Sequence, residues 1–160
     1  MAYHLRPATR DDQPAVEQLV FSVLAEYALT PDPTTTDADL RDLRGFYHDA
    51  GGTFDVLVAD SGKLVGTVGL FRMSPSTCEL RKMYLARAAR GQGQGRRLLE
   101  HALAQATALG CTRVVLETAT VLREAVQLYE RYGFRPYVPE HLAARCDAAY
   151  SLDLAPLKTA

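Results

Sequence analysis

Three glycines between a strand-like stretch and a helix-like stretch limit the fold of this chain more than any other feature. They occupy positions 91, 93 and 95, after the strand-like residues 77–85 and at the start of an amphipathic stretch that ends at residue 109. Glycine has no Cβ atom, so it adopts positive φ and lets a ligand approach the backbone closely. The segment therefore predicts a strand, an anion-binding loop and a helix, in that order.

The start of the predicted helix supplies what an anion requires. The first N–H groups of a helix have no partner within it, and the helix dipole places partial positive charge there. A pyrophosphate would be held mainly by the backbone, with the Arg90 and Arg96 side chains as supplements. The predicted cradle consists of Arg90, Gly91, Gln92, Gly93, Gln94, Gly95 and Arg96. A plain glycine-rich turn is the alternative, although such a turn requires only one glycine.

The spacing of the glycines distinguishes three classes of nucleotide-binding loop. A P-loop is excluded because no Gly-Lys-Ser/Thr follows. A Rossmann loop requires G-x-G-x-x-G after an apolar strand, whereas Arg96 takes the last glycine position and the strand is charged. The pattern Arg-x-x-Gly-x-Gly, from Arg90 to Gly95, resembles the pyrophosphate-binding motif of the GNAT superfamily of acetyl-CoA-dependent N-acetyltransferases.

A second segment, further along the chain, strengthens this resemblance. Residues 125–134, AVQLYERYGF, are similar to the family's A-x-x-L-Y-x-x-x-G-F segment. The resemblance implies acetyl-CoA as the co-substrate, without a metal, and a direct transfer to a primary amine in a ternary complex. It also implies that pantetheine lies between the strand 79–85 and the strand 114–117, next to the backbone N–H groups of Met83 and Leu85.

Composition and charge are those of one globular domain over residues 1–160. The chain is 48% hydrophobic and carries a net charge of −1, which gives no broad field for nucleic acid or an anionic membrane. Basic residues near the glycines nevertheless suit a polyanion such as coenzyme A: Arg81, Lys82, Arg87, Arg90, Arg96 and Arg97. No apolar run reaches the roughly 18 residues of a membrane span, and the N-terminus has no signal-peptide core.

The three cysteines indicate neither a disulfide framework nor a zinc site. Cys78, Cys111 and Cys146 are odd in number, far apart and without metal-ligand spacing. We therefore expect a cytoplasmic protein with reduced thiols. Cys146 is expected to be a small buried residue rather than a nucleophile, since direct transfer requires no acyl-enzyme.

The apolar periodicity predicts the element order β-α-α-β-β-β-α-β-α-β-β. Thr9 and Asp12 form a capping-box pair that starts the first helix, with Pro14 in its first turn. The order implies a GNAT-like mixed, mostly antiparallel sheet of six to seven strands with helices on both faces. The expected strands are 3–6, 53–59, 63–72, 77–85, 114–116, 135–138 and 148–154, and the later helices are 37–48, 95–109 and 122–132.

Tyr129 and Glu79 are the candidate catalytic residues. Tyr129 matches the family's general acid, and a phenol with a pKa near 10 can protonate a departing thiolate; the alternative is an ordinary half-buried aromatic. Glu79 matches a glutamate that removes the amine proton, through water because its usual pKa near 4.3 is far below that of an amine. A solvated Glu79 paired with Arg81 is the alternative, and Glu117 is a competing base or amine anchor.

The acceptor site is expected to draw on Tyr27, Glu117 and His141, and its acidic residues suit a small cationic amine. The family often has an asparagine where this chain has Leu122, which places a polar contact to pantetheine in doubt.

Two other functions stay open within this resemblance, a protein or peptide N-acetyltransferase and a non-catalytic acyl-CoA-binding module. A dinucleotide-dependent reductase is a rival from another class, and a homodimer formed through the terminal strands is open.

Overall fold

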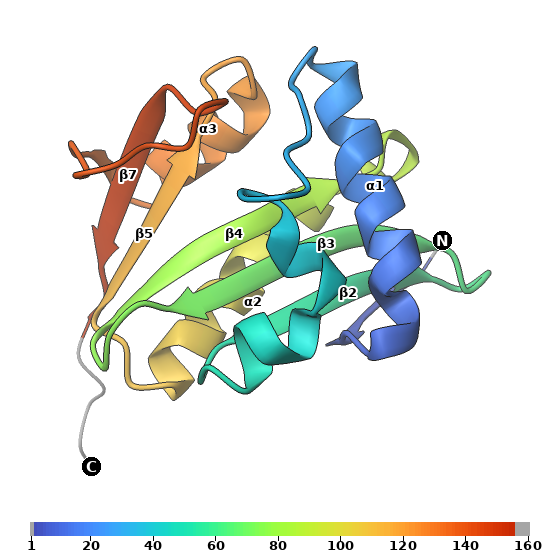
Figure 1. Ribbon diagram of the computed structural model, residues 1–160, viewed down its shortest axis with the longest axis horizontal. Coiled ribbons are helices and arrows are strands. Elements are labelled where there is room, and N and C mark those ends of the chain that lie inside the picture. Colours follow the sequence, from blue (N-terminus) through green and yellow to red (C-terminus); the bar gives the residue numbers. More distant parts are fainter. Residues whose placement is uncertain (1, 156–160) are drawn as a thin grey trace.

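Seven strands form one mixed sheet in the computed structural model, which describes residues 2–155 (Figure 1). Across the sheet the strands are β1 (Tyr3–Pro7), β2 (Thr53–Ala59), β3 (Leu64–Arg72), β4 (Thr77–Leu85), β5 (Arg113–Thr118), β7 (Ala148–Asp153) and β6 (Arg135–Pro136). Only β4 and β5 pair in parallel; all other neighbours are antiparallel. The predicted sheet is confirmed, and no helix in this part of the chain is long and apolar enough to cross a lipid bilayer.

Three α-helices cover the two faces of this sheet: α1 (Gln13–Glu26), α2 (Gln94–Ala108) and α3 (Arg123–Arg131). α1 lies on one face, where Val16, Val20 and Leu24 pack on Phe54 of β2. α2 and α3 lie on the other face, over a larger core (Figure 1). The predicted arrangement of helices on both faces is therefore correct.

The helix predicted over residues 37–48 is wrong. This segment forms a 3-10 turn (Ala38–Arg41) and a π turn (Arg44–His48) instead. Asp37 and Asp39 are buried, and Asp42 accepts a hydrogen bond from the Gly45 amide at 3.0 Å. Short acidic side chains that bond to nearby backbone compete with a continuous helix, so the segment breaks into two turns.

The predicted capping box of Thr9 and Asp12 begins a 3-10 turn, Arg10–Asp12, that leads directly into α1. The Asp12 carboxylate accepts a hydrogen bond from the Thr9 amide at 2.7 Å, and two from the Arg6 guanidinium at 2.7 and 2.9 Å. The hydrogen bond from Arg6 is the main cause that lowers the pKa of Asp12 to about 2. A carboxylate with a lowered folded-state pKa stabilises the fold above its unfolded pKa, and this contribution is lost as the pH falls through the folded value.

We expect Asp12→Asn to lower the free energy of unfolding by about 1 to 2 kcal/mol at pH 7. The difference from the wild type should shrink between pH 4 and pH 2, where Asp12 becomes protonated. Urea unfolding at pH 7, 4, 3 and 2 measures this, with Asp11→Asn as the control because Asp11 is exposed. Parallel stability curves for Asp12→Asn and the wild type would contradict the assignment.

β4 and β5 separate after a short parallel contact. They pair at Thr77 with Arg113, Cys78 with Val114 and Glu79 with Val115, but not beyond. From there β4 continues beside β3, whereas β5 pairs along its length with β7. Figure 1 shows the two strands diverging, so the sheet opens into a gap at their carboxyl ends.

A β-bulge in β4 gathers polar side chains on the α1 face. The pairing with β3 shifts between Thr67 and Gly69, Lys82 has φ of +53°, and the Thr67 hydroxyl donates to the Lys82 carbonyl at 2.7 Å. The extra residue reverses the alternation of side chains along the strand. Leu80 and Met83 therefore both face the α2 core, and the α1 face receives Glu79, Arg81, Lys82 and Tyr84.

Cys78 and Cys111 form a disulfide, contrary to expectation, with Cα atoms 6.2 Å apart. The Thr112 amide donates to the Ser76 carbonyl at 2.8 Å, so the first rung of the parallel pair brings the two cysteines together. Both are buried, and Cys146 stays a free thiol. Their separation of 33 residues concealed the pairing, because only the β4–β5 contact makes them neighbours.

Candidate active site

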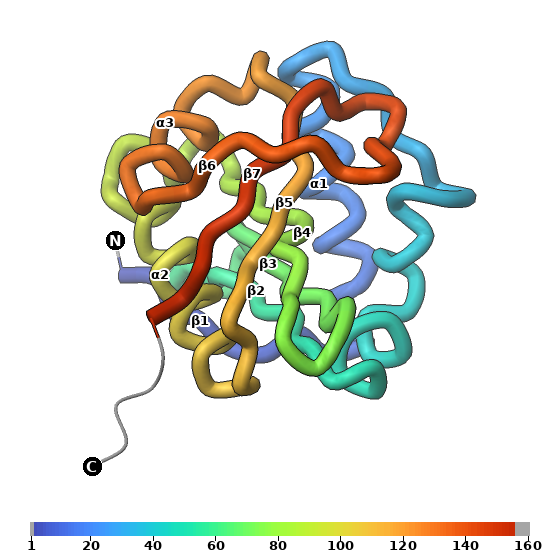
Figure 2. Tube along the Cα trace, turned by 90° about the vertical axis from the view of Figure 1, so that its left-hand side faces the viewer, coloured from blue at the N-terminus to red at the C-terminus, as the bar shows by residue number. Residues whose placement is uncertain are grey.

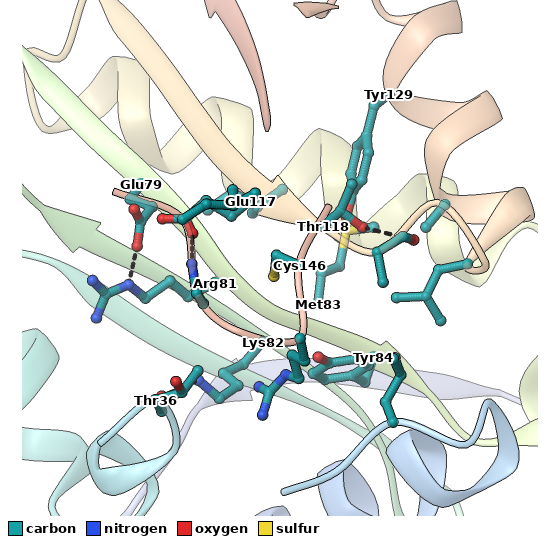
Figure 3. Close-up of a pocket in the computed structure, with 18 of the residues that line it drawn as sticks. Thr36, Glu79, Arg81, Lys82, Met83, Tyr84, Glu117, Thr118, Tyr129 and Cys146 are labelled. Atoms are coloured by element: carbon teal, nitrogen blue, oxygen red, sulfur yellow. Dashed lines mark hydrogen bonds and ion pairs between the residues drawn. The ribbon is translucent and has the colours of Figure 1, made fainter. Parts of the chain in front are cut away.

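A cavity of about 380 Å³ lies where β4 and β5 separate (Figure 3). Its walls come from β4, β5, α3, the loop of residues 28–37 and the loop of residues 137–147. It brings together the following residues that the sequence singled out: Glu79, Met83, Glu117, Leu122, Tyr129, His141 and Cys146. Tyr27 does not line it; its ring lies 5.9 Å below the Arg90 guanidinium.

The glycine loop leads from the end of β4 into α2 with its amides unused. Gly91 and Gly93 have φ of +74° and +79°, and Gly93 is the N-cap of α2. The Arg97 amide donates to the Gly93 carbonyl at 3.1 Å. Within residues 2–155 the amides from Gly91 to Arg96 donate to no backbone or side-chain acceptor. These amides are free to donate to an anion, and the start of a helix carries partial positive charge. Both properties fit the diphosphate of an acyl carrier.

The two arginines beside this loop bind protein partners instead. Arg90 donates to the Leu85 carbonyl at 2.9 Å and to Glu26 at 2.8 and 3.2 Å. Arg96 donates to Glu100 at 2.8 Å and to the Tyr132 hydroxyl at 3.0 Å. Arg81 and Lys82, expected near the loop, line the cavity instead. An anion at the loop would therefore be held chiefly by main-chain amides.

The last residues of β4 expose backbone groups toward the gap. The Ala86 amide donates to the Val65 carbonyl of β3 at 2.7 Å. Because amides alternate in direction along a strand, those of Met83 and Leu85 face away from β3. The Leu85 carbonyl likewise faces away, since it accepts from Arg90. A ligand in extended conformation can hydrogen-bond here as a further strand would.

Tyr129 enters the cavity from α3. Its ring packs against Phe134, with centroids 5.7 Å apart, and its side chain is buried. Burial raises the pKa of Tyr129, and nearby Tyr84 and Cys146 raise it further. Within residues 2–155 its hydroxyl donates to no protein acceptor, so the proton is available to a ligand in the gap.

Tyr84 is a second cavity tyrosine, which sequence analysis did not single out. Burial is the main cause that raises its pKa to about 12. The only signal for this role in the sequence is the position of Tyr84 in the strand. Simple alternation would place Tyr84 on the face opposite to Arg81, and the bulge reverses this orientation.

Glu79 and Glu117 face the cavity from neighbouring strands with different partners. Figure 3 shows their carboxylates on the same side of the cavity. Glu79 is buried and accepts a hydrogen bond from Nε of Arg81. Glu117 accepts the Ala143 amide at 2.6 Å and has no cationic partner within residues 2–155. Glu117 is therefore the carboxylate whose charge is least compensated.

A buried ion network joins the two loops over the cavity, and sequence analysis missed it. Arg145 donates to both Asp37 oxygens at 2.6 and 2.7 Å, and Lys82 Nζ lies 3.4 Å from Asp37 and 3.2 Å from Asp39. Burial opposes ionisation of Asp37, yet hydrogen bonds from Arg145 and the Asp32 amide hold the pKa of Asp37 below its usual range. Figure 2 shows the two loops meeting above the sheet.

Cys146 lines the cavity without being activated. Burial, followed by the negative charge of Glu117, raises the pKa of its thiol to about 11. The thiolate is the nucleophilic form of cysteine, and it is scarce at neutral pH in this environment. The side chain is half-buried rather than buried, and its raised pKa favours the expected role as a residue that is not a nucleophile.

Comparisons with known proteins agree with this geometry. The acetyltransferase (GNAT) family matches residues 18–134. The uncharacterized N-acetyltransferase YjgM of Escherichia coli K12 is 38% identical over 135 residues, which cover 81% of this chain and 80% of the relative.

Two solved structures share the fold at low identity. A GNAT-family acetyltransferase from Staphylococcus aureus Mu50 has a TM-score of 0.90 at 21% identity, covering 96% of this chain and 100% of its own. A GNAT superfamily phosphinothricin acetyltransferase from Sinorhizobium meliloti, in complex with AcCoA, has a TM-score of 0.72 at 20% identity, covering 96% and 89%.

Proposed function

Because the chain belongs to the GNAT acetyltransferase family, we propose that it transfers acetyl from acetyl-CoA directly to the primary amine of a small molecule. The observation that carries this proposal is the separation of β4 and β5: the cavity with Tyr129 lies where these strands part, and β4 continues from there toward the free amides of the glycine loop. The two loops joined by Asp37 and Arg145 cover the cavity, which favours a small acceptor over a protein segment.

The chain's own residues would hold the co-substrate along this gap. The amides from Gly91 to Arg96 bind its diphosphate, and the amides of Met83 and Leu85 pair with its pantetheine or polarise the thioester carbonyl. Leu122 offers the pantetheine an apolar contact where the family often has asparagine. Acetyl-CoA supplies an activated acyl carbon, so no acyl-enzyme is needed.

The protons follow two routes in this proposal. The bond between the amine nitrogen and the acyl carbon forms as the carbon–sulfur bond breaks. Glu117 holds the amine, Glu79 receives the amine proton through water, and Tyr129 donates a proton to the departing sulfur. The pairing of Glu79 with Arg81 restrains its carboxylate at the strand, in reach of the cavity.

Thiol release from acetyl-CoA, measured with a panel of small amines and peptides, tests the proposal. We expect small primary amines to accelerate release and peptides to do so less. Release by peptides alone would favour the protein acetyltransferase, and tight acetyl-CoA binding without any accelerated release would favour a non-catalytic module. NADH binding without coenzyme A binding would indicate a reductase.

We expect Cys146→Ala to keep kcat within about twofold of the wild type, because direct transfer forms no thioester on the protein. Steady-state thiol release with an accepted amine measures this. Denaturing mass spectrometry of the wild type after incubation with acetyl-CoA provides the control and should show no added acetyl group on Cys146. Loss of activity together with an acetylated Cys146 would contradict direct transfer.

A cytoplasmic location and a homodimer stay predictions. The Cys78–Cys111 disulfide weighs against the first, because cytosolic thiols are mostly kept reduced.

A further inference from the structure

Two of the three cationic side chains that line the cavity are paired with buried carboxylates of the ion network. Both terminal nitrogens of Arg145 bind Asp37, and the Lys82 ammonium contacts the Thr36 carbonyl, Asp37 and Asp39. The charge of each cation is therefore compensated by buried carboxylates of the ion network.

Arg81 is different, since only one of its nitrogens is used. Nε donates to Glu79, and the guanidinium carbon lies 4.3 Å from the centre of the Phe71 ring. Its two terminal nitrogens donate to no acceptor within the chain from residue 2 to residue 155, and the side chain is 32% exposed. The salt bridge and the aromatic ring fix the orientation of the guanidinium and leave its outer edge free.

The unused groups of the cavity are thus of opposite sign. Glu117 lacks a cation, and Arg81 has two terminal nitrogens without an acceptor in the described chain, yet the two residues do not pair with each other. They project on the same face from strands that separate at this point (Figure 3). A ligand with both charges would satisfy both groups at once, whereas a simple amine would leave the guanidinium edge without a partner.

We infer that the acceptor is an amine that also carries a carboxylate, as a free amino acid does. The Arg81 edge binds the carboxylate with two parallel hydrogen bonds, a geometry that guanidinium and carboxylate share, and Glu117 binds the amine end. This inference rests on the proposed function of the same cavity. Arg81 then determines specificity, because an acceptor without the anion leaves its donors unpaired.

Matched acceptors test this inference: L-methionine and L-phenylalanine, each against its carboxamide. The readouts are kcat/KM from thiol release and Kd from calorimetry with CoA-loaded protein. In the wild type we expect each acid to exceed its amide at least tenfold in both. Arg81→Gln should reduce that ratio to about one, and Arg81→Lys, which keeps the charge but not the planar edge, should give an intermediate ratio.

Two controls separate charge recognition from general damage. Arg44→Gln changes an exposed arginine away from the cavity and should leave the ratio as in the wild type. Glu117→Gln can still accept the Ala143 amide; it should weaken acids and amides equally and leave the ratio unchanged. Arg81→Lys also keeps the inference testable if Arg81→Gln does not fold.

The outcomes distinguish the inference from the proposed function. Equal turnover of acids and amides by the wild type would overturn the inference and leave the acetyltransferase proposal intact. Acids that bind through Arg81 without being acetylated would support carboxylate recognition by Arg81. The same result would contradict the proposed acetyl transfer. If none of these acids binds or reacts, the inference is wrong.

Discussion

Tyr129→Phe is expected to lower kcat by about 10²- to 10³-fold, the usual loss when a general acid is removed. The change deletes only the hydroxyl, so the ring still packs on Phe134 and the Kd for acetyl-CoA should change less than about threefold. Thiol release at saturating acetyl-CoA measures kcat, and calorimetry measures Kd. The split between the two distinguishes a proton donor from an aromatic that only packs.

The pH profile provides a further test of Tyr129. The protonated phenol is the required form, and burial raises its pKa above the usual 10. Activity should therefore not fall through ionisation of Tyr129 anywhere below pH 10. A loss of wild-type activity below pH 10 that is absent from Tyr129→Phe would contradict the raised pKa.

Two other tyrosines make matched controls. Tyr132→Phe removes a hydroxyl from the C-cap of the same helix, where it binds Glu100 and Arg96 outside the cavity, and kcat should stay within about twofold. Tyr84→Phe tests the second phenol of the cavity. A large loss in Tyr84→Phe with little loss in Tyr129→Phe would reassign the general acid to Tyr84.

Gly93→Val is expected to weaken acetyl-CoA binding at least about a hundredfold. Gly93 has φ of +79° at the N-cap of α2, a conformation that a β-branched residue adopts only at a cost of about 1 to 2 kcal/mol. To relieve this strain the loop must rotate, and its amides then no longer face one anion. A ligand at a hundredfold excess over its Kd stabilises a protein by about 2.7 kcal/mol, and at the same ligand concentration this should fall to about 0.4 kcal/mol or less in the variant.

Gly62→Val is the control for backbone strain. Gly62 has φ of +88° in the β2–β3 hairpin, and a Cβ atom there, as at Gly93, would meet no atom within 4 Å. Both variants should lose similar stability without ligand, but only Gly62→Val should keep the full thermal shift with CoA. Equal shifts in the two variants would show that the loop amides do not bind the diphosphate.

Local sequence determined most of the elements of this protein and the loop that carries its cofactor proposal. Residues 53–59 and 77–85 form strands over the predicted range, and the capping box at Thr9 and the glycine C-terminal to α2 lie where expected. These features depend on side-chain periodicity and on backbone preferences within a few residues. The same local pattern places free amides at the start of α2.

Tertiary structure decided the chemistry of the cavity. The bulge at Lys82 requires the pairing of β4 with β3, and it alone places Tyr84 on the same face as Arg81. The ion pair of Asp37 with Arg145 spans 108 residues, and the disulfide of Cys78 with Cys111 depends on the parallel contact of β4 and β5. Periodicity reports which face of an element is apolar, but not which distant charge meets another, because such pairs form only when the whole sheet is assembled.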